Sequence, residues 1–224
     1  MTIGMPYVMR LGYGLRKPRS GIRGTDLSGV VEKVGGKAGL WQVGDEVLGW
    51  GTRTFAEYAA VDEDHLVAKP TSLSFEEAAA IPMAGSVALQ AWRDVAKVEA
   101  GDHVLVVGAS GGIGTFAVQI AKAMGARVTG VCSTPNVELV ESLGADHVID
   151  YTERDFTDDA RQYDAILDMA DKHTLTQRRL ALKTGGTLIP NSGEGGRWFG
   201  SLGRIFKAWR LSPLVSGRLR PFLS

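Results

Sequence analysis

The pattern of hydrophobic and polar positions along the chain changes at Gly85. Before it, short apolar runs are separated by glycine-containing turns, which is typical of strands in a small barrel or sandwich. After it, short apolar runs alternate with stretches that have the period of a helix. Alternating strands and helices indicate a parallel sheet. The sequence therefore predicts an α/β protein with a β-rich first part.

The β-rich part should lead into a helix. A helix is expected to start after Ser74, because Glu77 stands three residues later, which is the spacing of a capping box. Apolar runs bounded by turn residues predict strands upstream of it, at residues 30–34, 46–50, 54–61 and 65–69.

The strongest local pattern lies in residues 104–115. Apolar, mostly β-branched residues predict a buried parallel strand there. A glycine-rich turn follows, and residues 116–124 have the pattern of a helix that ends at Gly125. A helix is also predicted at residues 135–143. Further strands are predicted at residues 127–131, 147–149, 164–168 and 187–189.

The glycines of that turn are spaced much as in a dinucleotide-binding fingerprint. Gly108, Gly111 and Gly114 stand three residues apart. Such glycines make a tight turn, leave room for a pyrophosphate and let the helix pack closely on the strand. Backbone N–H groups and the helix dipole then attract phosphate. An ordinary tight turn is the alternative, but the order of strand, turn and helix favours cofactor binding.

Composition narrows the classes of function. The chain of 224 residues has 25 basic and 25 acidic residues, so no global positive field favours nucleic acid. The single cysteine, Cys132, excludes an internal disulfide and a cysteine-rich zinc site, and it fits a reducing compartment. Pro82 and Gly85 interrupt the longest apolar run, residues 78–92, which is too short to span a membrane.

The first residues bear on localisation. Basic but no acidic residues precede Asp26, as in a mitochondrial presequence. Gly12, Gly14 and Pro18 interrupt the amphipathic helix that such a signal needs. We therefore expect ordinary mature sequence and a cytoplasmic protein.

The residues after the predicted strand 127–131 bear on the choice of cofactor. An NAD-binding unit places Asp or Glu about 20 residues past the glycines, where it binds the ribose 2′-hydroxyl. No acid stands there in this chain to repel a 2′-phosphate. Thr134 can cap the next helix, so Ser133, Thr134, Asn136 and free N–H groups are candidates to bind that phosphate. This favours NADPH, and a plain helix cap is the alternative.

Several motifs together resemble those of the medium-chain dehydrogenase/reductases, in the zinc-independent quinone oxidoreductase (zeta-crystallin-like) branch. The resemblance implies a partial GroES-like catalytic domain at residues 1–83 and a Rossmann domain, a doubly wound parallel sheet, at residues 84–224. NADPH would lie in the cleft between them. The motifs occur in family order and are the glycine loop and residues 24–31, 43–47, 55–58, 78–82 and 143–151.

The resemblance also implies which residues contact the cofactor. The residues of the glycine loop would contact the pyrophosphate. They are Gly108, Ser110, Gly111, Gly112, Ile113 and Gly114. Ser133 and Tyr151 would lie near the 2′-phosphate and the adenine, although Tyr151 could instead pack as a lid on the sheet edge. Asn191, Ser192 and Gly193 would lie beside the nicotinamide.

Catalysis should not use a metal. Zinc-containing members of the family have a His-Glu pair where this chain has Thr25 and Asp26, and a four-cysteine lobe that this chain lacks. A tetrahedral zinc site needs three or four nitrogen or sulfur ligands. The histidines are scattered along the chain, so we expect no zinc.

The expected activity is reduction of a quinone, enone or aldehyde by NADPH. It needs mainly orientation and a donor that polarises the substrate carbonyl. Asp26 and Tyr7 are the candidates for this donor. The alternatives are a turn-forming role for Asp26 and packing for Tyr7. The alternative function is a catalytically impaired nucleotide-binding or interaction protein.

The resemblance further implies a chain shortened at both ends, because relatives usually begin with strands before Met1 and end with a strand and helix after Ser224. The tail from Arg197 should be a basic amphipathic helix that packs on that missing segment, with membrane contact or a lid as alternatives. An unpaired strand edge and an uncovered apolar face favour association, so we expect a homo-oligomer. The apolar face comprises Phe199, Leu202, Phe206 and Trp209.

Overall fold

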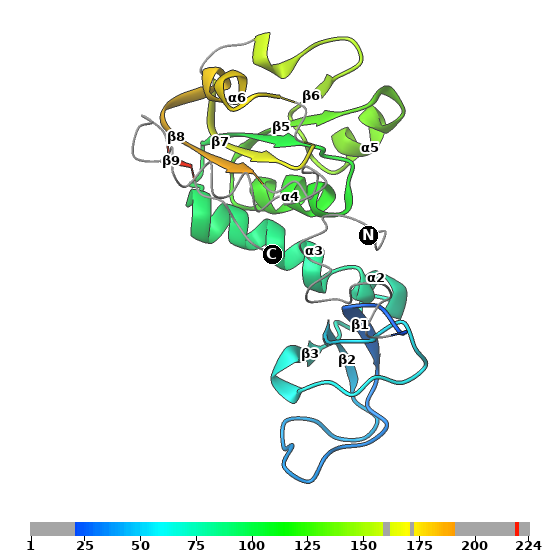
Figure 1. Ribbon diagram of the computed structural model, residues 1–224. Helices are drawn as coiled ribbons and strands as arrows, with labels where there is room; N and C mark the ends of the chain where they lie inside the picture. Colours follow the sequence, from blue (N-terminus) through cyan, green and yellow to red (C-terminus); the bar gives the residue numbers. More distant parts are fainter. Residues whose placement is uncertain (1–20, 159–161, 171–172, 191–217, 220–224) are drawn as a thin grey trace. The chain divides into compact units, whose positions relative to one another are not determined.

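The computed structural model describes residues 21–158, 162–170, 173–190 and 218–219. These residues belong to two compact units, one reaching to Ser86 and the other beginning at Val87. The first is a small antiparallel sheet with a short helix, and the second is a parallel sheet with helices (Figure 1). The predicted α/β class with a β-rich first part is therefore confirmed.

The small unit is built on three antiparallel strands in the order β1-β2-β3. Ser28 pairs with Leu48, and Leu48 pairs with Val67 on its other side. Ser74 and Glu77 form the predicted capping box at the start of α2: the Ser74 hydroxyl accepts from the Glu77 N–H at 3.2 Å, and the Glu77 carboxylate accepts from the Ser74 N–H at 2.9 Å. The elements are β1 (Asp26–Val30), β2 (Glu46–Trp50), the 3₁₀ turn η2 (Glu63–His65), β3 (Leu66–Ala68) and α2 (Phe75–Ala79).

Two of the strand predictions for this unit are wrong. The strand expected at residues 30–34 lies instead at Asp26–Val30, because its antiparallel partner β2 begins at Glu46, opposite Val30. Residues 54–61 form no strand, and residues 55–57 make a bend. The Phe55 N–H donates to the Arg23 carbonyl, at 2.8 Å, in the segment before β1.

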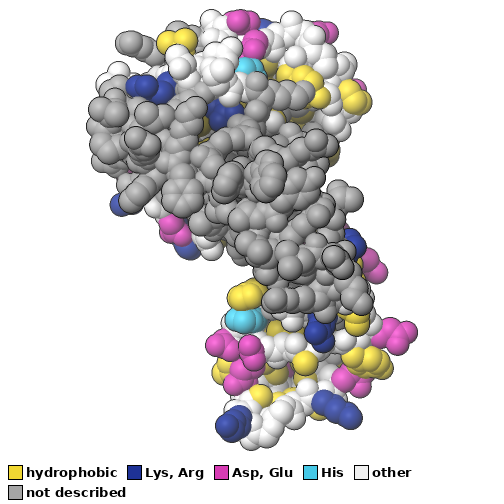
Figure 2. Space-filling view, in the orientation of Figure 1, with side chains coloured by type: hydrophobic (Ala, Val, Ile, Leu, Met, Phe, Trp, Pro, Cys, Tyr) yellow, Lys and Arg dark blue, Asp and Glu magenta, His cyan; other side chains and the backbone are white. Residues whose placement is uncertain are grey.

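The small unit buries few large side chains. Its buried hydrophobic residues are Val47, Leu48 and Ala78. Figure 2 shows hydrophobic side chains at its surface among charged ones. Phe55 and Tyr58 are 78% and 73% exposed. The other exposed large hydrophobic residues among those described in this unit are Ile22, Val30, Val34, Leu40, Val43, Trp50, Val67 and Met83.

The large unit contains a six-stranded sheet in which every strand runs parallel to its neighbours. The order is β6-β5-β4-β7-β8-β9, so the chain winds outward from β4 to β6 and then returns to start again at β7. This is the Rossmann order, whose switch point lies between β4 and β7. The strands are β4 (His103–Val107), β5 (Arg127–Cys132), β6 (His147–Asp150), β7 (Tyr163–Asp168), β8 (Leu182–Pro190) and β9 (Arg218–Leu219).

The last strand changes one expectation. β9 pairs with β8, with Arg218 opposite Thr187 and Leu219 opposite Leu188. The outer edge of β8, which we expected to be unpaired, is therefore covered in part by the C-terminal part of the chain. The predicted amphipathic helix with Phe199, Leu202, Phe206 and Trp209 lies outside the described residues.

Helices cover both faces of the parallel sheet (Figure 1). Successive residues of β4 alternate between the two apolar cores: Val104 and Val106 lie in one, and Leu105 and Val107 in the other. The first core includes residues of α4 and α5, and the second includes residues of α6 and η5. These elements are α4 (Gly112–Ala123), the 3₁₀ turn η4 (Thr134–Asn136), α5 (Val137–Ser142), the 3₁₀ turn η5 (Phe156–Asp158) and α6 (Leu175–Ala181). Among the described residues, no helix is both long and apolar enough to cross a membrane.

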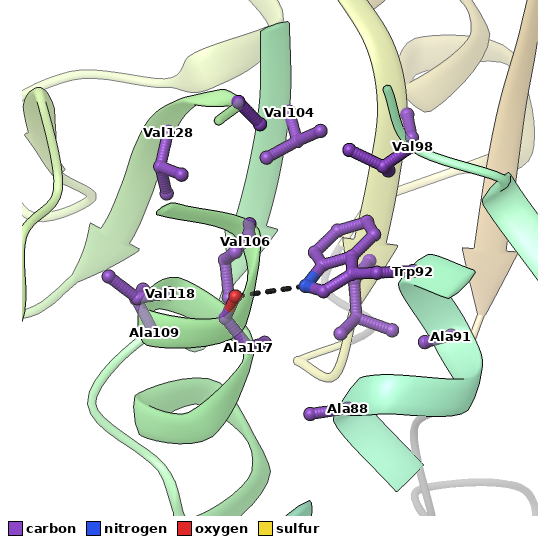
Figure 3. Packing of buried hydrophobic residues seen from close by; sticks show 14 of the residues in the cluster. Ala88, Ala91, Trp92, Val98, Val104, Val106, Ala109, Ala117, Val118 and Val128 are labelled. Carbon is purple, nitrogen blue, oxygen red and sulfur yellow. Dashed lines mark hydrogen bonds between the residues drawn. The ribbon is translucent and has the colours of Figure 1, made fainter. Parts of the chain in front are cut away.

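Trp92 anchors the first core. Helix α3 (Pro82–Gln90) continues into a π-helical turn, η3 (Ala91–Ala96), which carries this side chain. The indole is fully buried, and its Nε1–H donates to the Ala117 carbonyl of α4 at 2.9 Å (Figure 3). One side chain thus ties α4 to the chain segment that precedes β4.

We predict that Trp92→Ala lowers the free energy of unfolding by about 3–5 kcal/mol, because it leaves a large cavity and removes a buried hydrogen bond. Urea unfolding followed by circular dichroism would measure this loss. Leu89→Ala is the matched control on the preceding helical turn, where the side chain is 37% exposed, and should cost less than half as much. Equal losses in the two variants would contradict the anchoring role of Trp92.

Candidate cofactor site

The glycine turn that follows β4 is fixed to the neighbouring strand. The N–H groups of Gly108 and Ala109 both donate to the Val131 carbonyl of β5, at 3.0 and 2.9 Å. Gly108 has a φ of +85°, in the region that favours glycine. The Gly111 N–H donates to the Gly108 carbonyl at 3.0 Å and closes the turn. The turn therefore lies at the carboxyl edge of the sheet, beside the switch point where ligands of such sheets bind.

Gly112 and Gly114 differ in how much space surrounds them. A Cβ at Gly114 would collide with the Gly108 carbonyl oxygen and would lie 2.8 Å from backbone atoms of Ala109, so only glycine lets α4 pack on the turn. A Cβ at Gly112 would meet none of the described residues within 4 Å. Packing among the described residues therefore explains the glycine at 114 but not the one at 112, which leaves open space between them at the start of α4.

The first turn of α4 offers backbone donors to that open space. Its N-cap is Gly111, which has no side chain to satisfy them. The first N–H groups of a helix have no intrahelical partner, and the helix dipole adds a partial positive charge there. Ile113 packs against the first core and holds this turn in place. Ser110, next to the open turn, is half-buried. The arrangement suits a phosphate group.

The loop after β5 contains the residues predicted to bind a 2′-phosphate. The Asn136 side-chain N–H donates to the Ser133 hydroxyl oxygen at 3.0 Å, which leaves the hydroxyl proton of Ser133 for a ligand. Thr134 does not cap a helix as predicted. It begins the 3₁₀ turn η4, in which Ser133 holds the N-cap position without a side-chain bond. The Thr134 hydroxyl instead lies 3.1 Å from the hydroxyl of Thr152.

Asp150 is a residue of this site that the sequence analysis missed. It ends β6 and pairs with Cys132 at the end of β5, immediately before Ser133. Its Oδ1 accepts from the N–H and the hydroxyl of Thr152, at 2.9 and 2.8 Å. Thr134 and Thr152 hold the pKa of the Asp150 carboxyl below its usual range by hydrogen bonding, so it is ionised at neutral pH. In the sequence, Asp150 directly follows the predicted strand 147–149 and lies within the motif at residues 143–151.

Two further residues lie at the same edge. Cys132 is buried, and this burial is the main reason that its thiol pKa is raised. Tyr151 follows Asp150, and its N–H donates to the Cys132 carbonyl at 3.1 Å. Its side chain is 49% exposed, so it is not a packed core residue.

A buried ion pair stabilises the end of β7. The Asp168 carboxylate lies 2.7 Å from Nε of Arg178 in α6, with both side chains almost fully buried. The other carboxylate oxygen of Asp168 accepts from the Ala170 N–H at 3.0 Å. Breaking one partner of a buried pair is costly, so this contact holds α6 and the loop after β7 in place.

The predicted catalytic residue Asp26 and the glycine turn belong to different units of the chain. Asp26 belongs to the small unit, where its Oδ1 accepts from the Met83 N–H in the first turn of α3 at 3.0 Å. Burial raises the pKa of Asp26. This contact fits the structural alternative for Asp26. Tyr7, Asn191, Ser192 and Gly193 lie outside the described residues. No cluster of three or more His, Cys, Asp or Glu side chains that could hold a metal occurs within the described ranges.

This chain is similar to known proteins in sequence and in fold. Residues 7–71 match the family described as alcohol dehydrogenase GroES-like domain, and residues 112–195 match the family described as zinc-binding dehydrogenase. A 2-methylene-furan-3-one reductase from Solanum lycopersicum is 35% identical over 224 residues, which are 92% of this chain and 56% of that protein. A chloroplastic NADPH-dependent alkenal/one oxidoreductase from Arabidopsis thaliana is 34% identical over 225 residues, with 91% and 56% covered.

A solved structure agrees with these matches. The quinone oxidoreductase from Coxiella burnetii superimposes with a TM-score of 0.79 and 29% identity, over 97% of this chain and 66% of that chain. The chain spans 56% of the length of the two curated relatives named above. The predicted resemblance is confirmed: the chain belongs to the medium-chain dehydrogenase/reductase superfamily and is quinone oxidoreductase-like.

Proposed function

We propose that the protein is an oxidoreductase that binds NADPH and transfers hydride to a quinone, an enone or an aldehyde without a metal. The observation that carries the proposal is the open space at Gly112, in front of the first turn of α4 and beside the switch point of the sheet. The names of the relatives, which include reductases of unsaturated carbonyl compounds and a quinone oxidoreductase, support the reaction class.

The residues at this edge fit a dinucleotide. Backbone N–H groups of Gly112 and Ile113 would bind the pyrophosphate, with Gly108, Gly111 and Gly114 shaping the turn. When bound, the cofactor supplies the hydride, and the protein orients it and excludes competing reactions. The adenosine end would face the loop after β5, where Ser133 and Asn136 each keep a side-chain proton to donate.

The preference for NADPH over NADH is part of the proposal. No acid follows β5, which is where NAD-binding units place one. The Arabidopsis thaliana relative is named for NADPH dependence. Metal-free reduction is supported by Thr25 and Asp26 at the position of the zinc-binding pair, and by the presence of one cysteine in the whole sequence.

The residues proposed to contact the substrate and the nicotinamide come from the sequence analysis. Asp26 and Tyr7 are proposed to polarise the substrate carbonyl, and Asn191, Ser192 and Gly193 to contact the nicotinamide. The Asp26 carboxyl accepts from the Met83 N–H through one oxygen, and it could donate to a substrate carbonyl only in its protonated form, which burial favours by raising its pKa. We also propose a homo-oligomer in the cytoplasm. The exposed apolar residues of the small unit support association.

Cofactor titration and turnover test the proposal directly. We expect fluorescence titration to give severalfold tighter binding of NADPH than of NADH, because the end of β5 lacks an acid. We also expect the purified protein to oxidise NADPH in the presence of a quinone or enone, at a rate that a chelator leaves unchanged. Binding without any turnover would favour the alternative of an impaired nucleotide-binding protein, and loss of activity on chelation would contradict metal-free catalysis.

Gly112→Asp tests the placement of the pyrophosphate. The new side chain has room in the fold, and an acid in the first turn of a helix is favourable for stability. Its carboxylate would stand where the pyrophosphate must lie, so the affinity for NADPH should fall roughly a hundredfold. Gln119→Asp adds the same charge to an exposed site further along α4 and should leave the affinity unchanged. Unchanged binding by a folded Gly112→Asp variant would refute the placement.

A further inference from the structure

We propose that Asp150 weakens the cofactor selectivity of this site: its carboxylate, at the end of β6, disfavours the 2′-phosphate and so limits the preference for NADPH over NADH. This inference rests on the proposed function, because it concerns the adenosine end of the same cofactor site. An NAD-binding unit carries an acidic residue at the end of its second strand, which corresponds to β5 here. In this chain the acidic residue, Asp150, stands instead at the end of the third strand, β6.

Strand register brings the carboxylate to the site. Cys132 and Asp150 are paired residues of adjacent parallel strands. Such strands lie about 4.8 Å apart. Ser133 and Thr134 follow Cys132 directly, so the donors expected to bind a 2′-phosphate stand beside Asp150. An anion bound by these donors would be a close neighbour of the Asp150 carboxylate.

The directions of the hydrogen bonds show which donors remain. The Thr152 hydroxyl donates its proton to Asp150 Oδ1 at 2.8 Å. Its oxygen lies 3.1 Å from the Thr134 oxygen and can therefore only accept there. The Thr134 hydroxyl proton is thus committed to a chain of hydrogen bonds that ends on Asp150. Thr134 presents lone pairs rather than a proton to an incoming phosphate.

Ser133 differs from Thr134 in this respect. Its oxygen accepts from the Asn136 amide at 3.0 Å, which leaves its own proton available. Ser133 and Asn136 can donate to a ribose hydroxyl or to a phosphate, so they do not by themselves select the cofactor. The discriminating feature is charge: a 2′-phosphate carries up to two negative charges beside an ionised carboxylate, whereas a 2′-hydroxyl carries none and can donate to it.

The test compares the dissociation constants of NADPH and NADH, measured by fluorescence titration at low and high salt. Asp150→Asn keeps an oxygen acceptor for Thr152 and removes the charge. We expect the ratio of the NADH constant to the NADPH constant to rise about five- to tenfold at low salt. The gain should shrink at high salt, because Asp150 is partly exposed and the repulsion is screened. A role that is only structural would not depend on salt in this way.

Glu153→Gln is the matched control. It removes one negative charge from the same exposed loop, and we expect a change in the ratio of less than about twofold. Ser133→Ala should weaken NADPH binding, because the Ser133 hydroxyl proton is available to donate. Melting followed by circular dichroism checks that each variant is folded, and Asp150→Ser serves as a second neutral variant.

The outcomes separate the two proposals. If the unaltered protein binds both cofactors and neither neutral Asp150 variant raises the ratio, the selectivity role of Asp150 is wrong and the proposed function stands. An equal rise of this ratio in Glu153→Gln would also overturn the role of Asp150, because the loss of any negative charge from this loop would then explain the effect. If the unaltered protein binds neither cofactor, the proposed function fails and this inference fails with it.

Discussion

The close approach of helix α4 to the glycine turn is the constraint on which the cofactor site depends. Helix α4 packs on the turn only because Gly114 has no side chain to meet the Gly108 carbonyl. Hydrogen bonds to the Val131 carbonyl hold the glycine turn in place, and a hydrogen bond from the Trp92 indole holds α4. The start of α4 is therefore fixed by the backbone on one side and the apolar core on the other. A rigid helix start can present its N–H groups without reorganising.

The two units differ in how many of their apolar side chains they bury. The parallel sheet buries apolar side chains on both faces, and its central strand β4 is apolar and buried from Val104 to Val107. The small unit leaves Trp50, Phe55 and Tyr58 exposed. The stability of the large unit thus comes from its own core, whereas the small unit gains little from apolar burial among its described residues.

The sequence predicted best those elements whose signals are local. The strand, turn and helix from His103 to Ala123 needed only neighbouring residues, and so did the capping box at Ser74. The strand expected at residues 54–61 was wrong because an apolar run becomes a strand only when a partner pairs with it. Asp150 was missed for a related reason: its place beside Ser133 depends on the register of β5 and β6. Pairing between distant segments leaves no mark in local periodicity.

Cys132 has a consequence for chemical stability. Quinones and enones, the substrates proposed here, are electrophiles that alkylate thiolates, and the thiolate rather than the thiol is the reactive form. The chain has one cysteine, and it is buried at the end of β5 with a raised thiol pKa. Such a thiol is neither accessible nor ionised at neutral pH. Covalent inactivation through cysteine is thereby disfavoured for the compounds that the protein is proposed to reduce.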